Sequence, residues 1–127
     1  MRLAILAALL ATPAAAEVFQ TPSGNVQCYG EAGFVDCEVI VSETAPPEPR
    51  PADCDLDWGH RFSVADRGPG VMVCHGDTVR GTGYPVLPYG ARASFGAVTC
   101  TSEERGLTCV NPEGGGFLVS RRDQRLF

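Results

Sequence analysis

The fold is decided by a stretch that occurs twice, Gly24-Asn-Val26-Gln-Cys28 leading to Cys37-Glu-Val39 and Gly96-Ala-Val98-Thr-Cys100 leading to Cys109-Val110. In both copies the cysteines are nine positions apart, and Gly-x-Val-x precedes the first of them. Polar and apolar residues alternate around both pairs, which is typical of half-buried strands. The repeat therefore predicts two similar β-hairpins, each closed by its own disulfide.

The register of each hairpin follows from its cysteines. If Cys28 faces Cys37, then Tyr29 faces Asp36, Gly30 faces Val35, and the turn falls at residues 31–34. In the second copy the turn falls at residues 103–106. Facing residues on neighbouring strands lie about 4.5–5.5 Å apart at Cα, which is a separation that a disulfide accepts.

The remaining two cysteines are expected to pair with each other. The chain has six cysteines, an even number, and an exported chain meets an oxidising compartment. The predicted disulfides are therefore Cys28–Cys37, Cys54–Cys74 and Cys100–Cys109.

The rest of the chain also favours strands. Short period-two segments cover residues 61–64, 70–74 and 116–120, and no amphipathic helical pattern persists among the 15 glycines and ten prolines. Four prolines within residues 46–51 predict a stiff connector between the two copies. We expect an all-β, disulfide-stapled antiparallel sheet or barrel-like domain built from two similar hairpins.

Residues 1–16 have the features of a signal peptide. Arg2 precedes the apolar run 3–11, and Ala14-Ala15-Ala16 forms an A-x-A cleavage site. The sequence thus predicts a single exported domain over residues 17–127, periplasmic or extracellular, with no later segment apolar enough to span a membrane.

The charge of the expected mature chain points away from anionic partners. It has no lysine, and nine arginines against 15 acidic residues give a formal charge of −6. Such a surface repels nucleic acids and anionic membranes, so a basic exported protein is the better partner.

The sequence offers no recognisable catalytic frame. Neither G-x-S-x-G nor HExxH occurs, and lysine and a free thiol are missing from the expected nucleophiles. We expect no enzymatic activity, no cofactor and no metal.

Two polar clusters nevertheless leave a metal-binding site as an open alternative. Asp53, Asp55 and Asp57 resemble the start of a calcium loop, but the glycine comes one position late and Val64 occupies the twelfth position. The alternative is a disulfide-anchored turn with carboxylates facing solvent or pairing with arginine. His60, His75 and Asp77 would form a second cluster only if the fold brought them together; otherwise His75 is an exposed histidine at a strand end.

A candidate binding loop comprises Ser23, Asn25, Trp58 and Tyr89. Ser23 and Asn25 belong to a Pro/Gly turn at residues 21–25, where their side chains would either close the turn or be presented to a partner. Both aromatic residues lie beside Gly or Pro, so we expect them to be partly exposed.

Several blocks of the chain resemble one known family. These blocks are Phe19-x-Thr21-Pro22-Ser23-Gly24-Asn25-Val26-x-Cys28, Cys54-x-Leu56-Asp57-Trp58-Gly59, Cys74-x-Gly76-Asp77-Thr78, Leu87-Pro88-Tyr89-Gly90 and Gly116-Phe117-x-x-Ser120-Arg121. They are similar to small exported bacterial domains of unknown function, the domain-of-unknown-function family 6636. Members commonly have Gly-His-Gly-Phe where this chain has Gly114-Gly115-Gly116-Phe117. The resemblance implies export and this fold unit, and no activity.

Two functional hypotheses follow. The first is a non-enzymatic interaction or binding module of the cell envelope, which fits a small stapled β scaffold with an acidic surface. The alternative is an inhibitor of a secreted basic hydrolase, similar in style to lysozyme inhibitors, in which the acidic body steers the encounter and the loop 21–25 enters the enzyme.

Overall fold

The protein is all-β, as the sequence predicts. The computed structural model describes residues 16–127, which form ten strands and no helix. The expected signal peptide, residues 1–16, lies outside the described residues except for Ala16. Within the described part of the chain, no helix is long and apolar enough to cross a membrane.

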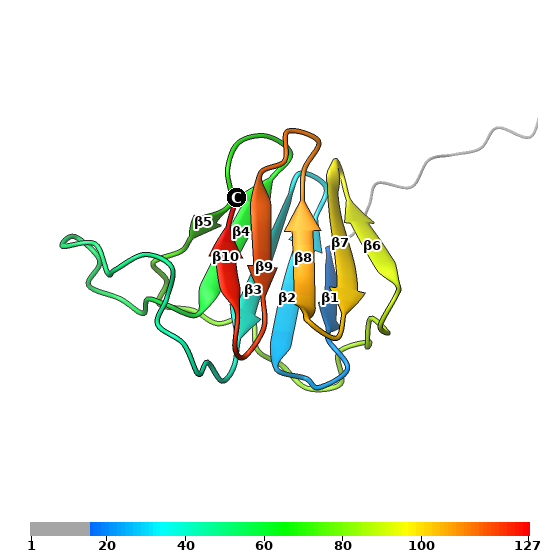
Figure 1. Ribbon diagram of the computed structural model, residues 1–127, viewed down its shortest axis with the longest axis horizontal. Coiled ribbons are helices and arrows are strands. Elements are labelled where there is room, and N and C mark those ends of the chain that lie inside the picture. The colour runs from blue at the N-terminus through cyan, green and yellow to red at the C-terminus, as the bar shows by residue number, and fades with distance from the viewer. Residues whose placement is uncertain (1–15) are drawn as a thin grey trace, which may run out of the picture.

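The strands form two five-stranded antiparallel sheets, each joined in chain order (Figure 1). The first sheet contains β1 (Glu17–Gln20), β2 (Val26–Glu31), β3 (Phe34–Val39), β4 (Arg61–Ala65) and β5 (Val71–Met72). The second contains β6 (Arg92–Phe95), β7 (Val98–Glu103), β8 (Gly106–Val110), β9 (Gly116–Val119) and β10 (Gln124–Leu126). The sheets remain separate and pack face to face as a sandwich.

The predicted hairpins and their register are confirmed. Cys28 faces Cys37, Tyr29 faces Asp36 and Gly30 faces Val35, while Cys100 faces Cys109. Each hairpin turns over two residues, between Glu31 and Phe34 in the first copy and between Glu103 and Gly106 in the second. Gly33 supplies the positive φ of 111° that the first turn requires.

The internal repeat extends beyond the hairpins to all five strands of each sheet. One inward-facing residue per strand lies in register across each sheet, and the two rows occupy corresponding positions. The rows are Phe19, Cys28, Cys37, Phe62, Met72 and Ala93, Cys100, Cys109, Phe117, Leu126. The protein is therefore two copies of one five-stranded meander packed on each other.

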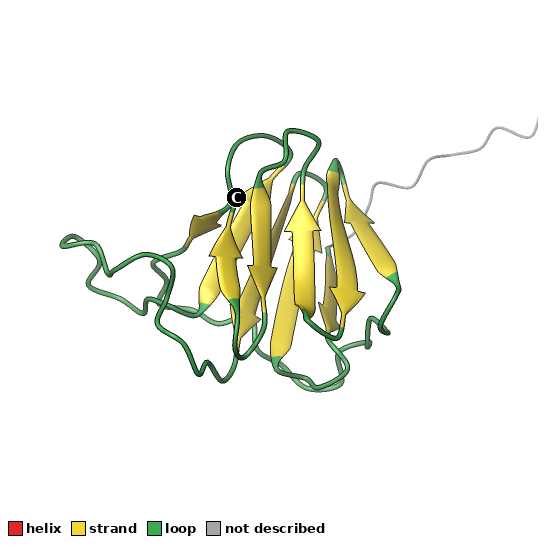
Figure 2. Cartoon of the chain, in the orientation of Figure 1, coloured by secondary structure: helices red, strands yellow, loops and turns green. Residues whose placement is uncertain are grey.

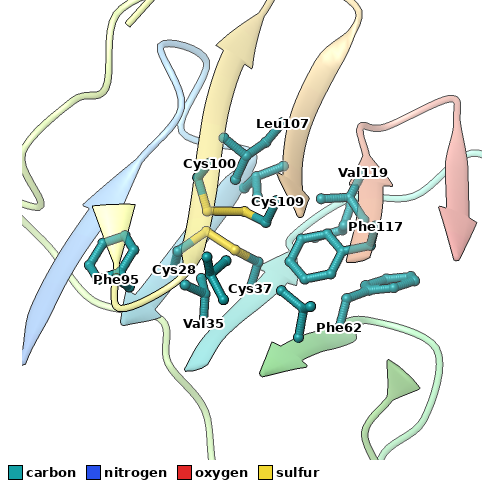
Figure 3. Packing of buried hydrophobic residues seen from close by; sticks show 14 of the residues in the cluster. Cys28, Val35, Cys37, Phe62, Phe95, Cys100, Leu107, Cys109, Phe117 and Val119 are labelled. Carbon is teal, nitrogen blue, oxygen red and sulfur yellow. A yellow bond between two sulfur atoms is a disulfide. The ribbon is translucent and has the colours of Figure 1, made fainter. Parts of the chain in front are cut away.

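The core forms where these rows meet (Figure 3). The disulfides Cys28–Cys37 and Cys100–Cys109 lie beside each other there, and all four cysteines are fully buried. Phe62 and Phe117 pack across the sheets with ring centroids 5.9 Å apart. Because the disulfides occupy the centre, they contribute to packing as well as to cross-linking.

The shorter strands were harder to predict. Residues 61–64 correspond to β4 and residues 116–120 to β9, whereas the predicted strand 70–74 shortens to Val71–Met72 in β5. β1, β6 and β10, of four, four and three residues, were not predicted, because they are too short for a visible alternation. All three complete the sheet edges.

The proline-rich connector, residues 40–60, joins β3 to β4 within the first copy and does not link the two copies as predicted, because the repeated unit includes all five strands. The third disulfide, Cys54–Cys74, joins this connector to the segment after β5. The connector projects from the sandwich (Figure 1), and Arg50 holds it by donating hydrogen bonds to the carbonyl oxygens of Cys54 and Leu56. The connector is thus an ordered projection.

One end of the sandwich is closed by hydrogen bonds between loops of the two sheets. Asn111, at the end of β8, donates to the carbonyl oxygens of Ala65 and Gly68 at 3.0 and 2.8 Å. Its Oδ1 accepts from the Gly115 amide at 3.0 Å. A Cβ at Gly115 would overlap the Gly68 carbonyl, so the histidine that the resemblance implies at this position would fit only if the loop 66–70 moved. The opposite end is also bridged between the sheets: the Glu43 amide donates to the Arg121 carbonyl at 2.8 Å, and Gln124 Nε2 donates to Ser42 Oγ at 2.6 Å.

Candidate functional site

The end of the sandwich opposite Asn111 contains a cleft of about 690 Å³, called the end cleft below. Its walls come from the β1–β2 loop, the end of β3, the turn before β6, and the β7–β8 and β9–β10 turns. These loops gather at the lower end of the sandwich in Figure 2. The volume lies within the range of about 300–1,000 Å³ that is typical of small-ligand sites.

The end cleft has an apolar floor and polar walls. Val26, Leu107 and Val119 form the floor, and all three are almost fully buried between the sheets. Ser23 and Asn25 line the wall from the first sheet, and three arginines, Arg105, Arg121 and Arg122, line it from the second. The arrangement combines apolar contact with charged and hydrogen-bonding groups.

Three of the four predicted binding-loop residues line this cleft. Ser23, Asn25 and Tyr89 are brought together although Tyr89 is distant from the other two in sequence, and Tyr89 is half exposed. Trp58 lies elsewhere, in the connector, where its indole N–H donates to the Glu48 carbonyl at 3.0 Å. The structure therefore groups three of the candidates and separates the fourth.

The loop 21–25 is held by its own side chains. Asn25 donates from Nδ2 to the Val41 carbonyl at 3.0 Å and accepts at Oδ1 from the Val41 amide at 2.9 Å. Ser23 Oγ accepts from the Asn25 amide at 3.2 Å. These bonds close the turn, which is one of the two roles predicted for Ser23 and Asn25. They also fix the shape of one wall of the cleft.

The charged groups of the end cleft are only partly paired. Arg122 Nε donates to Glu43 at 3.2 Å, while Arg121 Nε lies 3.8 Å from the same carboxylate. Arg105 is 3.4 Å from Glu103. The three arginine side chains are more than half exposed and the two glutamates nearly half, so their ion pairs are weak and readily exchanged.

A second polar arrangement, not anticipated from the sequence, crosses the outer face of the first sheet. Gln20, Gln27, Glu38 and Arg61 lie in register on β1, β2, β3 and β4, and are called the outer row below. Glu38, Arg61 and Gln27 are buried because the segment 73–87 covers them. A row of long polar side chains under a loop indicates a clamp for that loop.

Glu38 is the centre of the clamp. Its carboxylate accepts hydrogen bonds from the Val79 amide at 3.0 Å, the Thr78 hydroxyl at 2.9 Å, Arg80 Nε at 3.2 Å and Arg61 Nη2 at 3.1 Å. Burial opposes its ionisation, but the bonds from Val79 and Thr78 and the charge of Arg61 outweigh this, and hold the pKa of Glu38 below its ordinary value.

The neighbouring glutamines extend the clamp along the covering segment. Gln27 accepts from the Gly81 amide at 3.2 Å and donates to the Gly81 carbonyl at 3.0 Å, while Gln20 donates to the Tyr84 carbonyl at 2.8 Å. These bonds fix a loop that has little regular structure. The sequence shows Glu38 as one acidic residue in an alternating strand; only its register against Arg61 indicates the ion pair.

The two histidines have separate environments. His60 Nδ1 donates to the Val39 carbonyl at 3.0 Å, and His75 Nδ1 donates to the Asp77 carbonyl at 2.6 Å. The expectation of an exposed His75 was wrong, because it lies buried in a bridge opposite Asp57. Asp77 instead pairs with Arg61 at 2.9 Å, which lowers the pKa of Asp77 through that hydrogen bond.

The acidic triplet of the connector is open to solvent. Asp53, Asp55 and Asp57 are all exposed, as the turn alternative predicts. Among residues 16–127, no three His, Cys, Asp or Glu side chains are placed to hold a metal ion together.

The comparisons with known proteins give one match. Neither the curated proteins nor the solved structures include a match to this chain. A family model, "Family of unknown function (DUF6636)", matches residues 1–127, which is the whole chain. The chain therefore belongs to this family of unknown function, as its sequence blocks predict.

Proposed function

We propose that the protein is a non-enzymatic, exported binding module that takes its partner or ligand in the end cleft. The observation that carries this proposal is the end cleft of about 690 Å³, which loops of both sheets surround. Hydrogen bonds from Glu43 to Arg121 and from Gln124 to Ser42 hold two of these loops together. Binding sites commonly lie on loops that a rigid scaffold holds in place.

The end cleft is lined by groups suited to binding. Its charged side chains are three arginines and three carboxylates, Glu103, Glu104 and Asp123. Arginine, serine, asparagine and tyrosine, which line it, are well suited to hydrogen bonding and stacking. The three disulfides support export, because such bonds persist in oxidising compartments.

A pull-down with a matched pair of variants tests this proposal. The oxidised domain serves as bait for envelope and secreted fractions, beside Ser23→Trp, which fills the end cleft, and Ser94→Trp, which makes the same change at an exposed position on β6. We expect wild type and Ser94→Trp to retain the same partner and Ser23→Trp to lose it. Equal retention by all three, or turnover of a substrate by the pure domain, would contradict the proposal.

The inhibitor hypothesis remains a second candidate, and the fixed loop 21–25 favours it. Both hydrogen bonds between Asn25 and Val41 make that loop rigid, which lowers the entropic cost of binding. The expected net charge of −6 would speed association with a basic enzyme. The loop lines a concave surface, however, so it fits an enzyme cleft less well than a projecting loop would.

Inhibition assays separate the two candidates. An inhibitor should slow a basic lysozyme stoichiometrically, with an association rate that falls as added salt screens charges over about 10 Å at 0.1 M. Ser23→Ala should weaken this inhibition without unfolding the domain, since Ser23 makes one exposed hydrogen bond. Unchanged activity of several basic lysozymes at micromolar protein would remove this candidate and leave the binding module standing.

A further inference from the structure

We infer that the end cleft binds a short peptide with free termini, whose carboxylate contacts Arg121 and whose ammonium group contacts Glu104. This inference rests on the proposed function, because it names the ligand class of the same site. It follows from two side chains of opposite charge that line the cleft, one weakly paired and one unpaired among residues 16–127.

Arg121 provides the positive group. Within the described part of the chain, its one ion pair is with Glu43 at 3.8 Å, and its side chain donates no hydrogen bond. Glu43 is held closer to Arg122, at 3.2 Å, so it leaves Arg121 largely free. A guanidinium group has five donors in a planar fork that matches a carboxylate, and this fork remains available in the cleft.

Glu104 provides the negative group. It lies in the β7–β8 turn, is exposed, and has no ion pair or hydrogen bond with any residue in the described range 16–127. The neighbouring Glu103 already accepts from Arg105 at 3.4 Å. Glu104 is therefore the carboxylate of this wall that is free to accept from an ammonium group.

The mixed charge of the cleft selects against other ligand classes. Glu103, Glu104 and Asp123 balance the three arginines of the lining, so the cleft has no net positive charge to hold a polyphosphate, and the acidic chain as a whole repels polyanions. A neutral sugar would leave the free charges of both walls without a counterpart. A zwitterionic peptide satisfies both, and an apolar side chain on it would lie over the floor of Val26, Leu107 and Val119.

Titration of the oxidised domain with the tripeptide Ala-Leu-Ala, followed by NMR, tests the inference. The peptide is used in its free form, with an amidated carboxyl end, and with an acetylated amino end. The variants are Arg121→Gln and Glu104→Gln, with Arg67→Gln and Glu48→Gln as controls that remove the same charges at exposed positions outside the cleft. We expect the free peptide to shift cleft resonances, and each cleft variant to weaken its binding up to about fivefold.

The modified peptides identify which contact each variant removes. Arg121→Gln should weaken binding of the free and acetylated peptides, which have a carboxylate, and leave binding of the amidated peptide unchanged. Glu104→Gln should weaken binding of the free and amidated peptides, which have an ammonium group, and leave binding of the acetylated peptide unchanged. Equal binding of all three peptides, equal effects of control and cleft variants, or no shift of cleft resonances would overturn the inference. If peptides fail while Ser23→Trp still loses its partner in the pull-down, the proposed function stands and only the ligand class is wrong.

Discussion

Glu38 and Arg61 face each other on β3 and β4, and Arg61 Nη2 donates to the Glu38 carboxylate at 3.1 Å. Only 2% of the Glu38 side chain and 5% of the Arg61 side chain are exposed. Burying both charges is costly, and the pair is stable only where further hydrogen bonds satisfy the remaining atoms. Thr78, Val79 and Arg80 supply those bonds to Glu38, so the pair holds the segment 73–87 on the sheet. Arg61 Nη1 donates to Asp77 at 2.9 Å, whereas its buried Nε has no partner among the described residues.

Replacement of Glu38 by glutamine should destabilise the protein by about 2–4 kcal/mol. The amide oxygen can still accept from the Val79 amide, but Arg61 loses its buried counter-charge. Denaturant unfolding of the oxidised domain measures the loss, with Glu48→Gln as the exposed control. A change as small as that of the control would show that the outer row does not hold the covering segment.

The same carboxylate predicts a loss of stability in acid. The pKa of Glu38 is lowered by folding, so its unfolded form binds a proton at higher pH than its folded form does. Its contribution is therefore complete at neutral pH, begins to fall below about pH 4.3, and is lost as the pH passes through the lower folded pKa. Asp77, whose pKa Arg61 lowers, adds to the same trend.

Unfolding free energies measured between pH 7 and pH 3 check this prediction. We expect a plateau at the neutral end and a fall at the acidic end that is shallower in Glu38→Gln, because the variant has no proton to gain at that site. The same acid slope in both proteins would place the responsible carboxylate elsewhere.

The two central hairpins could be predicted from the sequence because the same pattern of cysteines and alternating residues occurs in it twice. The spacing of Cys28 and Cys37, repeated in Cys100 and Cys109, determines strand type, register and turn position together. The edge strands β1, β6 and β10 could not be predicted in this way. They are held by pairing with longer neighbours, which a short sequence window does not contain.

The end cleft was only partly predictable. Turn chemistry drew attention to Ser23 and Asn25, and a neighbouring Pro and Gly to Tyr89, but Arg105 and Arg121 give no local signal. Their place in the cleft depends on which ends of the strands meet. The outer row was missed for a related reason, since Arg61 is separated from Glu38 by the connector and pairs with it only across β3 and β4.

The buried disulfide Cys28–Cys37 should stabilise the protein more than Cys54–Cys74 does, although it closes the shorter loop. Loop entropy alone gives about 2.7 kcal/mol for Cys28–Cys37 and about 3.3 kcal/mol for Cys54–Cys74. Cys28 and Cys37 are fully buried, however, so serines there would also bury two hydroxyl groups, at about 1–3 kcal/mol for each one left unsatisfied. Cys74 is exposed, and carbonyl oxygens of the connector surround Cys54.

We therefore expect the Cys28→Ser, Cys37→Ser double variant to lose about 4–6 kcal/mol and the Cys54→Ser, Cys74→Ser double variant about 3 kcal/mol. Denaturant unfolding of both proteins under oxidising conditions gives the order. If the second variant is the less stable one, the central disulfides act through loop closure alone and their packing contributes little.

The contact between the first strands of the two sheets offers a test of the packing. Phe95 on β6 lies against Gly30 on β2 and stacks on Phe19, with ring centroids 5.6 Å apart. A Cβ at Gly30 would lie 2.5 Å from Phe95 Cε1, so the aromatic ring would have to move. Gly30→Ala should therefore lower the free energy of unfolding by about 1–3 kcal/mol through overpacking.

A double variant tests whether the space occupied by Phe95 is the cause. Phe95→Leu alone should also destabilise the protein, but the double variant should be more stable than the sum of the two losses predicts, because the smaller side chain leaves room for the added methyl group. Strictly additive losses in unfolding experiments would mean that Gly30 is required for its backbone and not for the space it leaves to Phe95.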